Sequence, residues 1–221
     1  MVINLMEYQE DVVSESKQYT NLENYDFPVF YYKHNKTQIY FKRLCLEVGK
    51  MCHIVGDKKT GKTLFLKSLC GLECPQDKPI NTVFLNYDIT YKPEIVQCNN
   101  ETILLKEYIK LKKITNYRIF ELYPYLNMKM VDIPEEKRQI LGFLLTLKKD
   151  SLFYMIDISI ENVSKETLKK IVDVFRTFCE KNNKIGLITT ATASSELISQ
   201  TDHVYHLKKN MENEYYGEQL V

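Results

Sequence analysis

Met51-Cys52-His53-Ile54-Val55 is followed directly by Gly56-Asp57-Lys58-Lys59-Thr60-Gly61-Lys62-Thr63, and this junction fixes the architecture expected of the 221-residue chain. An apolar strand that runs into G-x-x-x-x-G-K-T predicts a loop that holds the phosphates of ATP or GTP. Gly56 and Gly61 let the backbone curve so that successive N–H groups face the phosphates, and Lys62 reaches the β and γ oxygens. Thr63 is the expected Mg²⁺ ligand. From Leu64 the chain continues as a helix, whose positive N-terminal end attracts the anion.

Composition favours one domain with a full hydrophobic core, because 44% of the 221 residues are apolar. The 30 basic and 29 acidic side chains give a net charge of +1, so the molecule lacks the strong positive field of a typical free nucleic-acid binder, and we expect no DNA partner. Only Arg43, Arg118, Arg138 and Arg176 are arginines. So few arginines weaken any function that needs several bidentate phosphate contacts.

The cysteine pattern predicts a cytoplasmic protein. The six cysteines contain no C-x-x-C pair, and residues 1–9 do not form a secretory leader. No apolar run approaches the roughly 20 residues of a membrane span. His203 and His206 stand three apart in an expected strand, and the sequence around them completes no zinc ligand set. We therefore expect no zinc site and no membrane contact.

The N-terminal half begins with a polar arm over residues 1–24. Aromatic, β-prone segments at 27–32 and 38–44 predict an antiparallel sheet edge. A further strand region is expected at 83–87 and 89–91, and apolar spacing predicts a helix over 102–114.

The C-terminal half alternates helices and strands. A helix opens at Ile133-Pro134-Glu135-Glu136, with proline in its first turn and two acids at its positive end. The apolar run 152–156 predicts a central parallel strand that carries Asp157 at its tip. An amphipathic helix over 168–178 and a strand over 185–189 follow. We predict an α/β fold with a mostly parallel sheet, in a single domain over 25–221 that contains a helical subdomain at about 99–148. In such a sheet the phosphate loop and Asp157 meet at the carboxyl ends of the strands.

Several separated segments resemble one family, the nucleotide-binding domains of ABC-type ATPases. The resemblance runs from about Tyr25 to Leu207 and is greatest to the second such domain of the ribosome-recycling RNase L inhibitor family. In that family an aromatic-proline step precedes the phosphate loop by the interval seen for Phe27-Pro28. A Tyr-Lys-Pro-Gln segment occurs where this chain has Tyr91-Lys92-Pro93-Glu94, and this match is the most specific to the family.

The resemblance also implies roles that this sequence does not keep. The family's Leu-Ser-Gly-Gly-Glu signature, which completes the ATP site of a partner domain, is replaced by Val131-Asp132-Ile133-Pro134-Glu135-Glu136. Ile158 stands where the family has the catalytic glutamate that follows the strand-end aspartate, and Thr190 stands where it has a switch histidine. Glu94 stands for the glutamine that senses Mg²⁺. Proline removes an N–H and acids repel phosphate, so this surface should not complete a partner's site.

The expected site therefore keeps the groups that hold a nucleotide and lacks those that hydrolyse it. The predicted Mg²⁺ ligands are Thr63, Asp157 and Glu94. Phe27 is aligned with the family's adenine-contacting tyrosine, with Tyr31 and Tyr32 as competitors or all three as core residues. The residues expected to contact ATP are Gly56, Asp57, Lys58, Lys59, Thr60, Gly61, Lys62, Thr63, Leu64 and Phe27.

The first functional hypothesis is a degenerate ABC-type domain that binds ATP without efficient turnover and acts through a partner. The resemblance implies the ribosome, both rRNA and ribosomal proteins, or another ABC-type protein as that partner. The alternatives are an active ATPase that borrows a partner's signature, a nucleotide kinase, or a structural remnant without ligand. Lysine clusters such as Lys58-Lys59 and Lys112-Lys113 fit rRNA phosphates, but such lysines more often form an ordinary solvated face.

Overall fold

The computed structural model describes residues 24–27, 30–34, 37–41, 44–70, 72, 89–92, 102–158, 163–191, 195–209 and 214–220. Residues 1–23 of the predicted arm, the predicted strand at 83–87 and Glu94 lie outside these ranges. Asn24, the last residue of the predicted arm, is the first residue of a strand.

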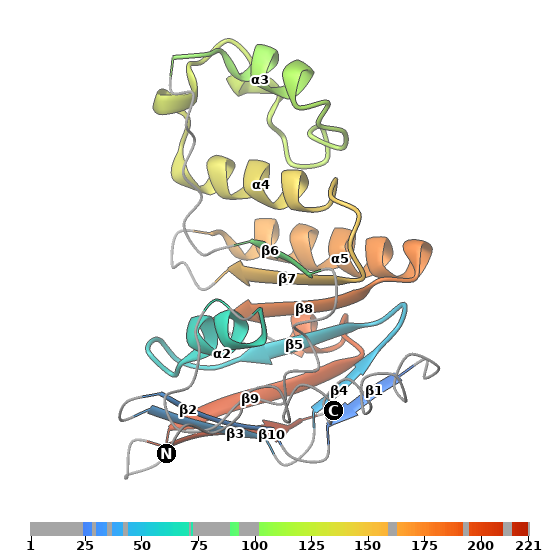
Figure 1. Ribbon diagram of the computed structural model, residues 1–221. Helices are drawn as coiled ribbons and strands as arrows, with labels where there is room; N and C mark the ends of the chain where they lie inside the picture. Colours follow the sequence, from blue (N-terminus) through green and yellow to red (C-terminus); the bar gives the residue numbers. More distant parts are fainter. Residues whose placement is uncertain are drawn as a thin grey trace, which may run out of the picture.

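The described residues form an α/β structure around an eight-stranded sheet in the order β2-β3-β10-β9-β5-β8-β7-β6 (Figure 1). The strands β9, β5, β8, β7 and β6 pair in parallel, whereas β2–β3 and β9–β10 are antiparallel. The predicted mostly parallel sheet with an antiparallel edge is therefore confirmed. The strands are β2 (Phe30–His34), β3 (Thr37–Phe41), β5 (Met51–Val55), β6 (Ile89–Lys92), β7 (Phe153–Ile158), β8 (Ile185–Thr190), β9 (His203–Lys209) and β10 (Glu214–Gln219).

A second, two-stranded sheet lies beside the main one. It pairs β1 (Asn24–Phe27) with β4 (Leu44–Glu47) in antiparallel register. Leu44 and Leu46 are buried in the same apolar cluster as β5 and β9, so alternate side chains of β4 face the main sheet. The sequence predicted one continuous strand at 27–32, but the structure divides that region between β1 and β2, which belong to different sheets.

Helices cover both faces of the sheet and extend beyond its β6 edge. α2 (Lys62–Leu69) packs on one face, and α5 (Lys165–Asn182) packs on the other. α3 (Leu105–Leu111) and α4 (Glu135–Thr146), with the 3-10 turns Tyr123–Tyr125 and Met130–Asp132, build the helical part drawn above β6 in Figure 1. The short α6 (Ser195–Ile198) precedes β9.

The elements form where periodicity and capping agree. All six residues of β7 are buried, as expected of a central parallel strand that is covered on both faces. The Ser164 hydroxyl caps α5 by accepting from Thr167 N–H at 3.2 Å, and Asn183 ends the helix with φ of 52°. Pro134 is the N-cap of α4, one position before the first turn in which the sequence had predicted it. Its missing N–H costs nothing at that position.

None of the helices in the described residues combines the length and the apolarity required to cross a bilayer.

Candidate nucleotide-binding site

The phosphate loop over residues 56–61 joins the carboxyl end of β5 to α2. A side chain at Gly56 would place its Cβ 2.5 Å from the Leu207 carbonyl oxygen and 2.9 Å from Thr60 Oγ1, so only glycine fits there. Gly61 has φ of 82°, a left-handed conformation that glycine adopts without strain. The two glycines of the motif are thus required for different reasons, the close approach of Leu207 and Thr60 at Gly56 and the left-handed backbone at Gly61.

Lys62 lies folded across the loop. Its Nζ donates to the carbonyl oxygens of Gly56 and Asp57, each at 2.7 Å, and the side chain is almost fully buried. The Thr60 hydroxyl donates to the Asp57 carbonyl at 2.8 Å and holds the same turn. This arrangement keeps an ammonium group within the concavity of the loop, where a phosphate oxygen can replace a carbonyl as its acceptor.

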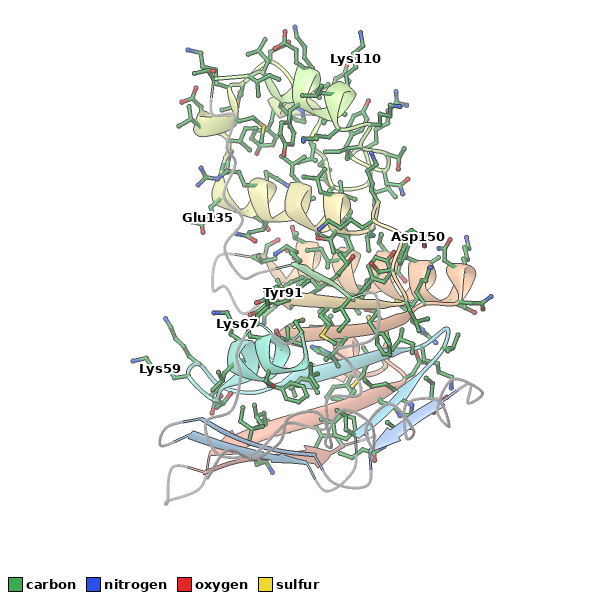
Figure 2. All side chains as sticks on the ribbon, viewed as in Figure 1. Lys59, Lys67, Tyr91, Lys110, Glu135 and Asp150 are labelled. Atoms are coloured by element: carbon green, nitrogen blue, oxygen red, sulfur yellow. The ribbon has the colours of Figure 1, made fainter. Side chains whose placement is uncertain are left out.

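The N-terminus of α2 is open to an anion. Its N-cap is Gly61, which has no side chain to cap the helix, and no acidic residue lies in the first turn. The partial positive charge of this helix end is therefore not neutralised by the helix itself. Asp57, Lys58 and Lys59 are exposed at the tip of the loop, and Lys59 projects away from the sheet in Figure 2.

The predicted metal ligands Thr63 and Asp157 are brought together. Thr63 Oγ1 donates to Asp157 Oδ2 at 2.6 Å, and Thr189 Oγ1 donates to Asp157 Oδ1 at 2.7 Å. Asp157 is completely buried, and these two hydroxyls hold its carboxylate. A hydroxyl and a carboxylate side by side are the hard oxygen donors that Mg²⁺ prefers, and this pair fits that ion. Glu94, the third predicted ligand, lies outside the described residues.

Lys92 is a site residue that the sequence analysis did not assign. Its Nζ donates to Gln139 Oε1 at 2.9 Å and to the Asp157 carbonyl oxygen at 3.2 Å, with only 2% of the residue exposed. The lysine joins the end of β6 to the helix α4 and to the backbone of the aspartate that faces Thr63. The sequence signal for this role is a lysine at the end of a half-buried strand. It could not identify the partner, because Gln139 on α4 lies 47 positions away.

Ile158 and Thr190 lie on the sheet face opposite to Asp157. Side chains alternate along a strand, so Ile158 shares the face of Ile156 and packs in the apolar cluster around α5, with 4% exposed. Thr190 is 1% exposed, and its Oγ1 lies 2.8 Å from His53 Nε2. Burial lowers the pKa of His53 to about 4, so this imidazole is neutral at pH 7. Neither position presents a general base to the phosphate loop.

The segment at the place of the ABC signature begins α4. Ile133 is buried, Pro134 has φ of −52° and ψ of 143°, and Glu135 and Glu136 fill the first helical turn. Glu136 Oε1 accepts from the Ser164 N–H at 2.9 Å, which ties this turn to the start of α5. Figure 2 shows Glu135 projecting on the same side of the molecule as Lys59. Two carboxylates therefore occupy a helix end that phosphate would otherwise favour.

The remaining predicted contact, Phe27, is the last residue of β1 and pairs with Leu44. The structure describes Phe27, Tyr31 and Tyr32 by their backbone only. The adenine contact stays a prediction.

Sheet order, phosphate loop and helical subdomain together give the fold of an ABC-type nucleotide-binding domain, within the P-loop NTPase class. Among solved structures, the chain is similar to an RNase-L inhibitor at TM-score 0.69 and 18% identity, over 91% of this chain and 41% of that one. It is also similar to an archaeal ribosome recycling factor, aABCE1, solved with the archaeal ribosomal stalk protein aP1, at TM-score 0.69 and 18% identity over 87% and 38% of the two chains. The chain thus spans less than half the length of either protein.

Isolated transporter subunits share the fold over more of their own length. The ATP-binding subunit of an ABC transporter matches at TM-score 0.57 and 16% identity, over 80% of this chain and 82% of that one. No protein-family model matches the sequence, and a comparison with curated proteins gives no match. The likeness therefore establishes the fold and does not establish the function, which depends on the residues of the site.

Proposed function

We propose that this chain binds ATP with Mg²⁺ at the phosphate loop, hydrolyses it very slowly, and acts through a binding partner. The observation that carries the proposal is the contrast between the two faces of the sheet. Lys62, Thr63 and Asp157 lie together at the loop, whereas Ile158 and Thr190 are buried on the other face. In this proposal the ATP-binding domain is the single unit 25–221, with its helical subdomain at about 99–148.

Slow hydrolysis follows from the missing general base. Loss of a base typically costs about 10² to 10⁴ in rate, and isoleucine offers no group that accepts a proton from water. Turnover in this fold also needs a signature from a second domain, and a second copy of this chain would offer the two glutamates of its segment 131–136 in that place. ATP is then a ligand that stabilises the fold, by about 4 kcal/mol at 1,000 times its dissociation constant.

Binding and turnover can be separated in one experiment. ATP affinity is measured by calorimetry in Mg²⁺ for the full chain, for Lys62→Ala and for the matched control Lys67→Ala on the same helix. We expect about tenfold or greater loss for Lys62→Ala and little change for Lys67→Ala, because only Lys62 lies across the loop. Equal affinity of the two variants would contradict the proposed site.

Turnover is followed as phosphate release on the same samples. We expect rates far below the ~1 s⁻¹ of ordinary enzymes. A rate at that level for the purified chain would instead support a nucleotide kinase or an active ATPase, and a rate that appears only with another ABC protein would support the borrowed-signature alternative.

The partner proposed is the ribosome, in the cytoplasm. The support is the likeness to the aABCE1 structures, one of which is described as ribosome-bound with archaeal Pelota. Exposed lysines of the helical subdomain, among them Lys106 and Lys110, would meet rRNA phosphates. Sucrose-gradient fractionation of native lysate tests this step by itself. Recovery of the protein only in the top fractions at low salt would contradict the ribosomal partner and leave ATP binding untouched.

A further inference from the structure

A second cluster of chemically active side chains lies at the other end of the central strands from the phosphate loop. Cys45 and Glu47 come from β4, and His203 is the first residue of β9. The register Cys52↔His203 places this histidine beside the start of β5, whereas the phosphate loop follows the end of β5 (Figure 1). At about 3.3 Å per strand residue, the cluster is more than 10 Å from the nucleotide site.

The three side chains converge on one point. His203 Nε2 lies 2.9 Å from Glu47 Oε1, and Cys45 Sγ lies 3.6 Å from the same oxygen. All three atoms lie within 4.8 Å of one another. Ligand atoms around a tetrahedral zinc ion, with bonds of 2.0–2.3 Å, are separated by roughly 3.3–3.8 Å, so small side-chain adjustments would admit an ion.

We propose that Cys45, Glu47 and His203 form a site for Zn²⁺ or a similar borderline divalent metal. A sulfur, a nitrogen and a carboxylate oxygen are the donor types that such an ion takes in proteins. The Cys45 thiol would lose its proton on binding, and the neutral imidazole would bind through Nε2. The side chains of His203 and Glu47 are 17% and 21% exposed, so water can reach the fourth position.

The backbone already orients two of the three donors. Cys45 and Glu47 are separated by one residue and so share one face of β4, while Leu44 and Leu46 anchor the other face in the core. The Cys45 N–H also donates to the hydroxyl of Tyr205 at 2.9 Å, and this bond holds β4 against β9. A metal there would tie the β1–β4 sheet to the main sheet.

The positive charge of Lys50 disfavours a metal ion at this site. Its Nζ lies 3.5 Å from Glu47 Oε2, the carboxylate oxygen that does not face the histidine. The Lys50 side chain is 46% exposed and can turn into solvent, so it weakens the affinity without blocking the ion. Without a metal, His203 Nε2 and Cys45 Sγ both contact Glu47 Oε1.

The test uses Co²⁺ as a spectroscopic probe in place of Zn²⁺, on the full chain after removal of metals. We expect one equivalent of Co²⁺ to give a thiolate-to-cobalt charge-transfer band and the intense visible bands of a tetrahedral site, and Zn²⁺ to displace both. Cys45→Ser should remove the charge-transfer band and lower the Co²⁺ affinity by about tenfold or more. His203→Gln should lower the affinity while the charge-transfer band persists at saturation.

Cys70→Ser is the matched control, because Cys70 lies at the end of α2 and contacts Met155 Sδ instead of the cluster. It should leave the spectrum unchanged. Absence of the band in the unmodified chain, or its persistence in Cys45→Ser, would overturn the assignment. Circular dichroism and ATP affinity, measured on every variant, separate loss of the metal site from loss of the fold.

Discussion

Buried His53 makes the free energy of unfolding depend on pH. Burial lowers its pKa to about 4 from the ordinary 6.5, so the unfolded chain binds a proton that the folded chain does not. The free energy of unfolding should therefore fall as pH decreases through 6.5 toward 4, by about 2 kcal/mol between pH 7 and pH 5 from this group. Urea unfolding of the unmodified chain and of His53→Gln at both pH values measures it. An equal pH dependence in the two proteins would exclude His53 as its source.

The negative charge of Asp157 should contribute to Mg²⁺ binding. In Asp157→Asn the amide oxygen still accepts from Thr63, but the charge that attracts the ion is lost. ATP affinity in Mg²⁺ should fall roughly tenfold, and the difference between affinities with Mg²⁺ and with EDTA should shrink. A variant that keeps the full Mg²⁺ effect would show that the ion is held elsewhere.

At the scale of elements, the contact between α5 and β8 depends on Gly186. A Cβ at this position would lie 2.6 Å from Cys179 Sγ and 2.9 Å from Phe175 Cζ, both on α5. Gly186→Ala should therefore lower the free energy of unfolding by about 1–3 kcal/mol. In a Cys179→Ala background the same change should cost less, because the sulfur is gone. Additive losses in the double mutant would contradict this contact.

The sequence predicted the elements whose periodicity reflects burial on both sides of the central sheet. β5, β7, β8 and α5 appear where apolar runs or an amphipathic stripe placed them, within a few residues. β10 was missed because its sequence, Glu214–Gln219, is polar and contains a glycine. Its strand state comes from pairing with β9 and β3, which lie far away along the chain.

The candidate site likewise contains residues that the sequence could predict and contacts that it could not. Lys62, Thr63 and Asp157 could be assigned because each follows a local motif or ends an apolar strand. The contacts of Lys92 with Gln139, and of His53 with Thr190, join residues 47 and 137 positions apart. The meeting of His203 with Cys45 and Glu47 depends on how β4 crosses β9, and no spacing in the sequence encodes it.

At the scale of the whole molecule, the start of α4 determines whether two copies can enclose ATP. In the ABC arrangement one domain's signature faces the phosphates held by the other. Here Pro134 lacks an N–H and Glu135 and Glu136 add negative charge in the first turn. We expect the chain to keep the mass of one copy when Mg²⁺ and ATP are added. Light scattering after size-exclusion chromatography measures this.

The charges of Glu135 and Glu136 also predict which change would favour pairing. Glu135→Gln with Glu136→Gln removes two charges from the helix end, so any ATP-dependent association should appear first in that variant. Salt screens the charges of the unmodified chain, so the difference between the two proteins should shrink as salt is raised. Lys62→Ala in the same background serves as the control, since a true ATP sandwich cannot form without bound nucleotide. ATP-dependent doubling of the mass of the unmodified chain, abolished by Lys62→Ala, would show that the glutamates do not prevent the sandwich.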